Sequence, residues 1–119
     1  GPGYITVRSG WQREPGDNRL VTPEPGSGVF YIEIGELEPL EVVSTPGTTY
    51  TGAVMVVDGG QRSLPPGAQL DLQSGVFHWM PGPGFIGTYE FALTVLGEDG
   101  QRFTDRIAVT IKPKNNYKL

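Results

Sequence analysis

The placement of glycine and proline constrains the fold of this chain more than any other feature. The 119 residues include 18 Gly and 11 Pro. No stretch of about 11 or more residues keeps apolar positions at helical spacing without one of them interrupting. These residues stand between short apolar runs rather than in one tract, which is typical of turns between strands. We therefore expect an all-β fold.

The C-terminal half has the clearest strand pattern. Residues 88–96 alternate between apolar and polar side chains, and residues 103–111 repeat the alternation after the turn-forming residues 97–100. Two alternating segments joined by a tight loop predict an antiparallel hairpin with one buried face. The inward side of the second strand is predicted to carry Phe103, Asp105, Ile107, Val109 and Ile111. Asp105 is near the start of the strand, where we expect the end of the sheet to be exposed to solvent.

Shorter strands are predicted through the rest of the chain. They are residues 4–8, 29–34, 37–43 (where Pro39 indicates an edge or a break), 50–57, 68–72 and 76–80. In the last of these, Phe77 and Trp79 share the face that we expect to be buried. Seven to eight short strands with one-sided alternation predict an immunoglobulin-like antiparallel β-sandwich.

The chain divides into three parts on this interpretation. Residues 1–28 form an N-terminal segment with one strand and, over 11–27, a Pro- and Gly-rich loop. The alternatives for this segment are that it packs on the sandwich as extra strands or that it joins the sandwich to a preceding module. Residues 29–113 form the sandwich, and residues 114–119 form a polar tail. Gly1 and Pro2 are typical of the scar left when a protease removes a tag, so we expect an excised piece of a longer protein.

Four sequence elements between residues 63 and 113 carry a family resemblance. They are LPPGAQLD at 64–71, QSGVFHWMP at 73–81, GTYEF at 87–91, and the hairpin at 98–100 followed by the alternating last strand. Their order and spacing resemble the immunoglobulin-like and dystroglycan-type cadherin-like repeat domains of large bacterial surface proteins. The resemblance implies a sandwich whose motif residues serve packing, on a protein that is secreted or exposed at the cell surface.

Composition argues against several functional classes. The chain has no cysteine, so it has no disulfide, no thiol nucleophile and no Cys-ligated metal. Its net charge is −4, and its only lysines are Lys112, Lys114 and Lys118. Without a basic stripe we expect no binding to nucleic acid or to anionic membrane surfaces. No apolar run approaches the roughly 20 residues that span a bilayer, so we expect no membrane insertion.

Candidate catalytic and metal-binding residues are few. His78 is the only histidine, and we expect it on the outward face of its strand as a solvated residue. No Gly-x-Ser-x-Gly elbow and no phosphate-binding loop is present, so we predict no enzyme activity, no catalytic residue and no cofactor. The four acidic residues Glu33, Glu36, Glu38 and Glu41 leave calcium as an alternative, although they lack a spaced loop motif and equally suit a solvated acidic edge.

Three aromatic residues outside the motif are candidate contacts to a partner or a sugar. Trp11, Tyr31 and Tyr50 would serve this role if exposed, whereas the alternative is that they complete the core. We expect a non-catalytic module of a larger bacterial secreted or cell-surface protein that serves protein–protein interaction, adhesion or spacing. Its expected partners are proteins or neighbouring domains of the same chain. The alternative is a carbohydrate-binding accessory module of a secreted enzyme, with a polysaccharide as partner.

Overall fold

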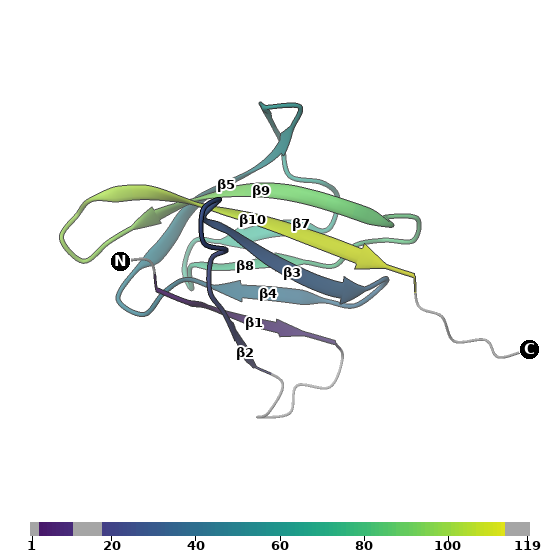
Figure 1. Cartoon of the computed structure of the whole chain (residues 1–119), viewed down its shortest axis with the longest axis horizontal. Helices are drawn as coiled ribbons and strands as arrows, with labels where there is room; N and C mark the ends of the chain where they lie inside the picture. Colours follow the sequence, from purple (N-terminus) through teal and green to yellow (C-terminus); the bar gives the residue numbers. More distant parts are fainter. Residues whose placement is uncertain (1–2, 11–17, 114–119) are drawn as a thin grey trace, which may run out of the picture.

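The computed structural model describes residues 3–10 and 18–113, and these residues form two packed β-sheets without a helix (Figure 1). The strands are β1 (Ile5–Ser9), β2 (Arg19–Val21), β3 (Val29–Gly35), β4 (Leu40–Val43), β5 (Thr49–Val57), β6 (Gly60–Arg62), β7 (Ala68–Asp71), β8 (Val76–Trp79), β9 (Gly87–Leu96) and β10 (Arg102–Lys112). No helix of the described residues is long and apolar enough to cross a membrane.

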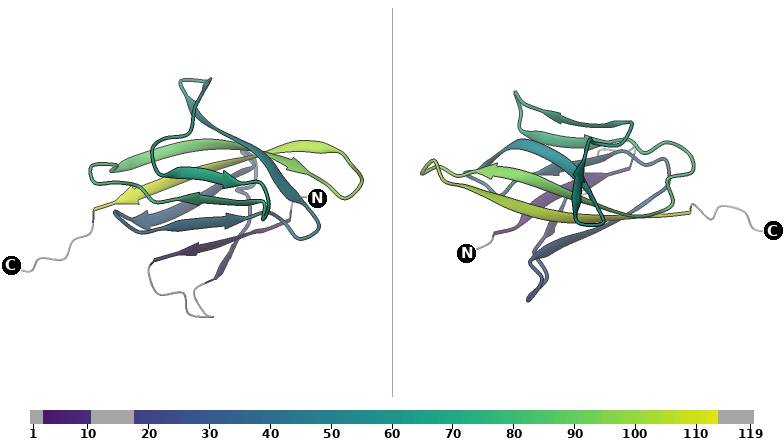
Figure 2. Two further views of the ribbon diagram at one scale, coloured as in Figure 1. Left: turned by 180° about the vertical axis from the view of Figure 1, so that it is seen from behind. Right: turned by 90° about the horizontal axis from the view of Figure 1, so that it is seen from above.

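The two sheets have the strand order of an immunoglobulin-like sandwich. The first sheet runs β2-β1-β4-β8-β7 and the second runs β3-β10-β9-β5-β6, as the views in Figure 2 show. Every pair is antiparallel except β3 with β10. The order β1-β4-β8-β7 matches strands A-B-E-D of immunoglobulin domains, and β10-β9-β5 matches G-F-C. The predicted fold class is confirmed, with ten described strands rather than seven to eight.

The core lies between the sheets and is built by alternation along each strand. Phe77 and Trp79 of β8 are buried as predicted, and the inward residues of the opposing sheet face them. The Trp79 ring meets Tyr89 and Phe91 edge-on, with centroids 5.3 and 5.2 Å away. Its indole N–H donates to the Pro66 carbonyl over 3.2 Å, so burial leaves no polar group unpaired. Full burial of such side chains contributes about 1.5–3 kcal/mol each.

The N-terminal strand is part of this core. β1 pairs antiparallel with β4, and its inward residues Ile5 and Val7 are fully buried. β1 alternates apolar and polar residues, so one face meets the second sheet and the other meets solvent. Residues before position 29 therefore contribute strands and side chains to the same sandwich as residues 29–113.

Two short strands lie outside the predicted set. β2 falls within the segment predicted as a loop, and β6 lies between the strands predicted at residues 50–57 and 68–72. Asp58 and Gly59 both have positive φ, which is the geometry of a tight hairpin turn that joins β5 to β6. Each strand has three residues and an exposed or half-buried surface, so backbone pairing forms them without an apolar period that the sequence could reveal.

The burial expected for Phe103 as a member of the inward set is wrong, because its side chain is 51% exposed. The remaining apolar residues predicted inward on β10, Ile107, Val109 and Ile111, are buried. The β9–β10 hairpin projects beyond the strands of the first sheet at the end where β1 begins (Figures 1 and 2). Alternation correctly gives the direction of the Phe103 side chain, but no opposing sheet covers it there.

Candidate functional site

A pocket opens at the end of the sandwich that carries the β4–β5 loop and the β9–β10 hairpin. Its volume is about 440 Å³, within the range of small-ligand sites. We call it the end pocket. Its walls include Thr45 and Thr48 of the β4–β5 loop, Phe30 of β3, and consecutive β10 residues Phe103, Thr104 and Asp105. Residues before β1 and in the β2–β3 loop complete it, so separate segments of the chain form one cavity.

The β4–β5 loop is held in shape by its own hydroxyl groups. The Thr48 backbone N–H and side-chain hydroxyl both donate to the Thr45 carbonyl, over 3.0 and 2.6 Å. Ser44 donates to the Thr48 carbonyl over 2.9 Å, and Thr45 donates to the Tyr4 carbonyl over 2.9 Å. Gly47 provides the positive φ that the turn requires. This wall of the end pocket is therefore tied both to itself and to the strand β1 that follows Tyr4.

Asp105 is the titratable group of the end pocket. Tyr50, which is 0% exposed, donates its hydroxyl to Asp105 Oδ2 over 3.0 Å. Burial raises the pKa of the Asp105 carboxyl, and the hydrogen bond from Tyr50 opposes this only in part. Burial raises the pKa of Tyr50 as well, and the adjacent Asp105 charge adds to that shift. Tyr50 thus stays a neutral donor that fixes the carboxylate at the pocket wall.

Because the pKa of Asp105 is raised in the folded chain, we expect the folding stability to depend on pH. In the pH range between its unfolded and folded pKa values, the folded chain binds more protons at this site than the unfolded chain. Stability from this group is therefore full below the unfolded pKa and is lost as pH rises through the folded value. Asp105→Asn keeps an acceptor for Tyr50 and removes the charge, so we expect it to stabilise the domain at pH 7 by up to about 1 kcal/mol after solvent screening.

Urea unfolding of both proteins from pH 3 to pH 7 measures this difference. The free energy gained by Asp105→Asn should grow with pH in that range. A gain that shrinks as pH rises would contradict the buried carboxylate.

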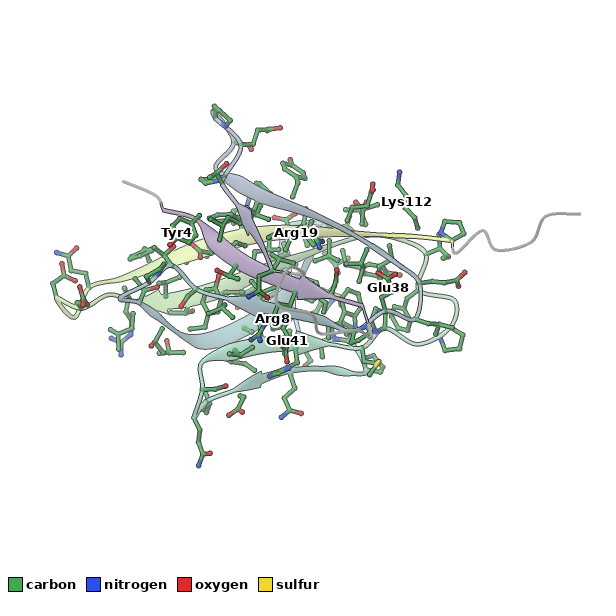
Figure 3. All side chains as sticks on the ribbon, turned by 90° about the horizontal axis from the view of Figure 1, so that it is seen from below. Tyr4, Arg8, Arg19, Glu38, Glu41 and Lys112 are labelled. Carbon is green, nitrogen blue, oxygen red and sulfur yellow. The ribbon has the colours of Figure 1, made fainter. Side chains whose placement is uncertain are left out.

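A second polar cluster lies on the outer face of the first sheet. Arg8, Glu41 and His78 are neighbours across β1, β4 and β8. Arg8 Nε lies 3.2 Å from Glu41 Oε1, and His78 Nδ1 lies 3.2 Å from Glu41 Oε2. Figure 3 shows Arg8 beside Glu41. The position of His78 on the outward face agrees with the expectation from alternation, and its contact with Glu41 follows from strand register, which the sequence does not reveal.

Because Glu41 is the centre of this cluster, we expect Glu41→Gln to lower the free energy of unfolding by about 1 kcal/mol. Its side chain is mostly buried, whereas Glu33 pairs with Lys112 over 3.0 Å with both side chains exposed. Glu33→Gln is the matched control and should change stability by less than about 0.5 kcal/mol. Equal effects of the two substitutions in urea unfolding would show that the cluster contributes nothing beyond an ordinary surface pair.

The four glutamates considered for calcium are distributed over separate contacts. Glu33 pairs with Lys112, Glu38 accepts the Gly35 backbone N–H over 3.1 Å, and Glu41 belongs to the outer cluster. Glu36 lies in the β3–β4 connection. Within residues 3–10 and 18–113, no group of three or more His, Cys, Asp or Glu side chains is placed to hold a metal ion.

The three candidate aromatics have different positions. Tyr31 is 54% exposed on the outer face of β3, and Tyr50 is buried and therefore has no surface for stacking. Trp11 lies outside the described residues. Phe103 is a surface aromatic that the sequence interpretation missed, and its closeness in the sequence to the hairpin loop was the available signal.

Comparisons with known proteins add no assignment. No protein-family model matches the chain, and a search of curated proteins found no match. Interpretation of the end pocket therefore depends on its geometry: one partly buried carboxylate, one exposed aromatic ring and threonine hydroxyl groups, all on a sandwich scaffold. Among the described residues that line it, Asp105 is the only titratable side chain. This combination suits reversible recognition of a ligand.

Proposed function

We propose that this chain is a non-catalytic, immunoglobulin-like module of a larger bacterial secreted or cell-surface protein, and that it binds a protein partner at the end pocket. The observation that carries the proposal is an exposed aromatic, Phe103, beside the partly buried carboxylate of Asp105 in a pocket of about 440 Å³. Aromatic side chains next to a pocket are the usual anchors of protein interfaces. Loops on a rigid scaffold are where binding residues concentrate.

The bacterial surface location is supported by the resemblance of residues 64–81 and 87–91 to cadherin-like repeats. Adhesion or spacing between domains would use the same module architecture, since the strand order is that of domains whose loops cluster at the two ends. The end pocket lies at the end that carries the β4–β5 and β9–β10 loops. In immunoglobulin variable domains the equivalent B–C and F–G loops contact the ligand.

Carbohydrate binding is the alternative, and the positions of the aromatics make it weaker. Stacking on a polysaccharide favours rings that share one surface. Tyr31 points away from the sandwich on the outer face of β3, whereas Phe103 belongs to the inward set of β10 and lines the end pocket. Tyr31 and Phe103 therefore do not form one platform.

Photo-crosslinking tests the proposal. A benzophenone amino acid is placed at position 103, and at position 31 as a control of similar exposure. The protein that crosslinks from position 103 is identified and purified, and its affinity is measured for the parent chain, Phe103→Ala and Tyr31→Ala. Loss of an aromatic anchor costs about 2 kcal/mol or more, so we expect Phe103→Ala to weaken binding at least about tenfold.

Tyr31→Ala should change the affinity less than about twofold. Binding that depends on Tyr31 and not on Phe103 would place the partner surface elsewhere. Specific binding of a polysaccharide with no protein crosslink would favour the alternative, and turnover of a substrate by the purified domain would contradict the non-catalytic assignment.

A further inference from the structure

Two of the three threonines that line the end pocket, Thr45 and Thr48, can offer their hydroxyl oxygens to a ligand only as acceptors. The Thr45 hydroxyl hydrogen is donated to the Tyr4 carbonyl and the Thr48 hydroxyl hydrogen to the Thr45 carbonyl. A hydroxyl has one hydrogen to donate and two lone pairs, so the oxygens of Thr45 and Thr48 keep the capacity to accept. A ligand at this wall is favoured if it brings hydrogen-bond donors.

Asp105 adds a negative charge to this set of acceptors. Among the described residues, Tyr50 is the hydrogen-bond donor to its carboxylate, and no Lys or Arg side chain lines the end pocket. Arg106, the next residue of β10, points to the opposite face and binds Glu90 Oε2 over 2.8 and 3.0 Å. A bound cation would offset the cost of holding the Asp105 charge in a partly desolvated position.

Phe103 and Phe30 supply the apolar part of the site. Phe30 is buried and forms a wall, whereas half of the Phe103 surface is exposed. An aromatic face within about 6 Å attracts an ammonium or guanidinium group, and the aliphatic stem of a long cationic side chain packs on apolar walls. Hydrogen-bond acceptors, a carboxylate and an exposed aromatic ring together complement a positively charged group that donates hydrogen bonds and accepts none.

We propose that the end pocket binds the cationic end of a lysine or arginine side chain presented by a protein partner. This inference depends on the proposed function for its partner and adds the chemistry of recognition. Ammonium and guanidinium groups donate hydrogen bonds and accept none, which complements the acceptors of the end pocket. A neutral sugar would leave the charge of the Asp105 carboxylate without a counterion.

The probes are Nα-acetyl-lysine methylamide and Nα-acetyl-arginine methylamide, followed by NMR titration of ¹⁵N-labelled protein. Because each probe is a small fragment, we expect a Kd of about 1–10 mM. Saturable shifts should centre on Thr45, Thr48, Phe103 and Asp105. The same lysine probe acetylated on Nε is neutral, as is methyl glucoside. We expect the Kd of both neutral probes to be at least about tenfold higher.

Matched variants distinguish the effect of the Asp105 carboxylate on binding from the effect of the overall charge of the protein. Asp105→Asn should weaken the cationic probe at least about tenfold, and Phe103→Ala about threefold or more. Asp99→Asn removes a charge from the same hairpin, where Asp99 accepts the Gln101 N–H and an asparagine can do so too. We expect Asp99→Asn to change the Kd less than about twofold.

The inference is overturned if the neutral probes bind as well as the cationic ones, if Asp99→Asn weakens binding as much as Asp105→Asn, or if no probe gives saturable shifts below about 50 mM. These results leave the proposed function intact if the crosslinked partner still needs Phe103. Conversely, a cationic probe that binds while no protein crosslinks from position 103 would contradict the proposed function alone.

Discussion

Trp79→Ala is expected to lower the free energy of unfolding by about 4 kcal/mol, a large part of the roughly 5–15 kcal/mol that stabilises an ordinary domain. The Trp79 side chain is 1% exposed and packs edge-on against Phe85, Tyr89 and Phe91. Its truncation removes these contacts and leaves a cavity between the two sheets. It also leaves the Pro66 carbonyl without the indole donor.

Urea unfolding followed by circular dichroism measures this effect. Phe103→Ala is the matched control, because it removes an aromatic ring of the same chain that is half exposed. We expect the control to cost less than about 1 kcal/mol. A cost for Trp79→Ala as small as that of Phe103→Ala would mean that the two sheets do not pack around this ring.

Gly67→Ala is expected to lower the free energy of unfolding by about 3 kcal/mol. Gly67 has a φ of +83°, a conformation that costs a residue with a Cβ about 1–2 kcal/mol. A Cβ on Gly67 would also lie 2.4 Å from the Met80 carbonyl oxygen, a backbone atom with little room to move. The Gly67 carbonyl meanwhile accepts the Met80 N–H over 3.0 Å, so relief of the clash would disturb this bond.

Gly84→Ala is the control that measures the cost of a positive φ without a steric clash. Gly84 has a φ of +87°, and a Cβ there would meet nothing within 4 Å. We expect it to cost about 1 kcal/mol. The two variants would contradict this structure if they unfold at the same urea concentration and their unfolding free energies fall with the same slope against urea. The turn before β7 would then not approach the end of β8 closely in solution.

Strand alternation explains why most of the sandwich could be predicted from the sequence. Phe77 and Trp79, or Phe91, Leu93 and Val95, lie two residues apart and share a face whatever the tertiary structure. β2 could not be predicted in this way, because its three residues pair with β1 without contributing an apolar period. Phe103 shows the limit of the same rule: alternation gives a direction for a side chain and cannot say where the opposing sheet ends.

The candidate site was less accessible to sequence reasoning, since its parts are far apart along the chain. Tyr50 and Asp105 are 55 positions apart, and their hydrogen bond depends on how β5, β9 and β10 are aligned. A bulge between Tyr50 and Gly52 changes which residues of β5 point inward. Strict alternation over residues 50–57 cannot show such a change. The threonines of the β4–β5 loop carry no pattern that indicates a pocket.

The Asp105 carboxylate is held partly buried in the end pocket, where we propose that it receives a cation. Its pKa is measured most directly by NMR titration of the Asp105 side-chain carboxyl carbon, in the free protein and in the presence of saturating Nα-acetyl-lysine methylamide. We predict a pKa above the ordinary aspartate value in the free protein, because burial disfavours the charge. The bound cation should lower this pKa, since it favours the ionised form. A pKa at or below the ordinary value in the free protein would mean that the carboxylate is not buried, and a pKa that the probe leaves unchanged would mean that Asp105 does not receive the cation.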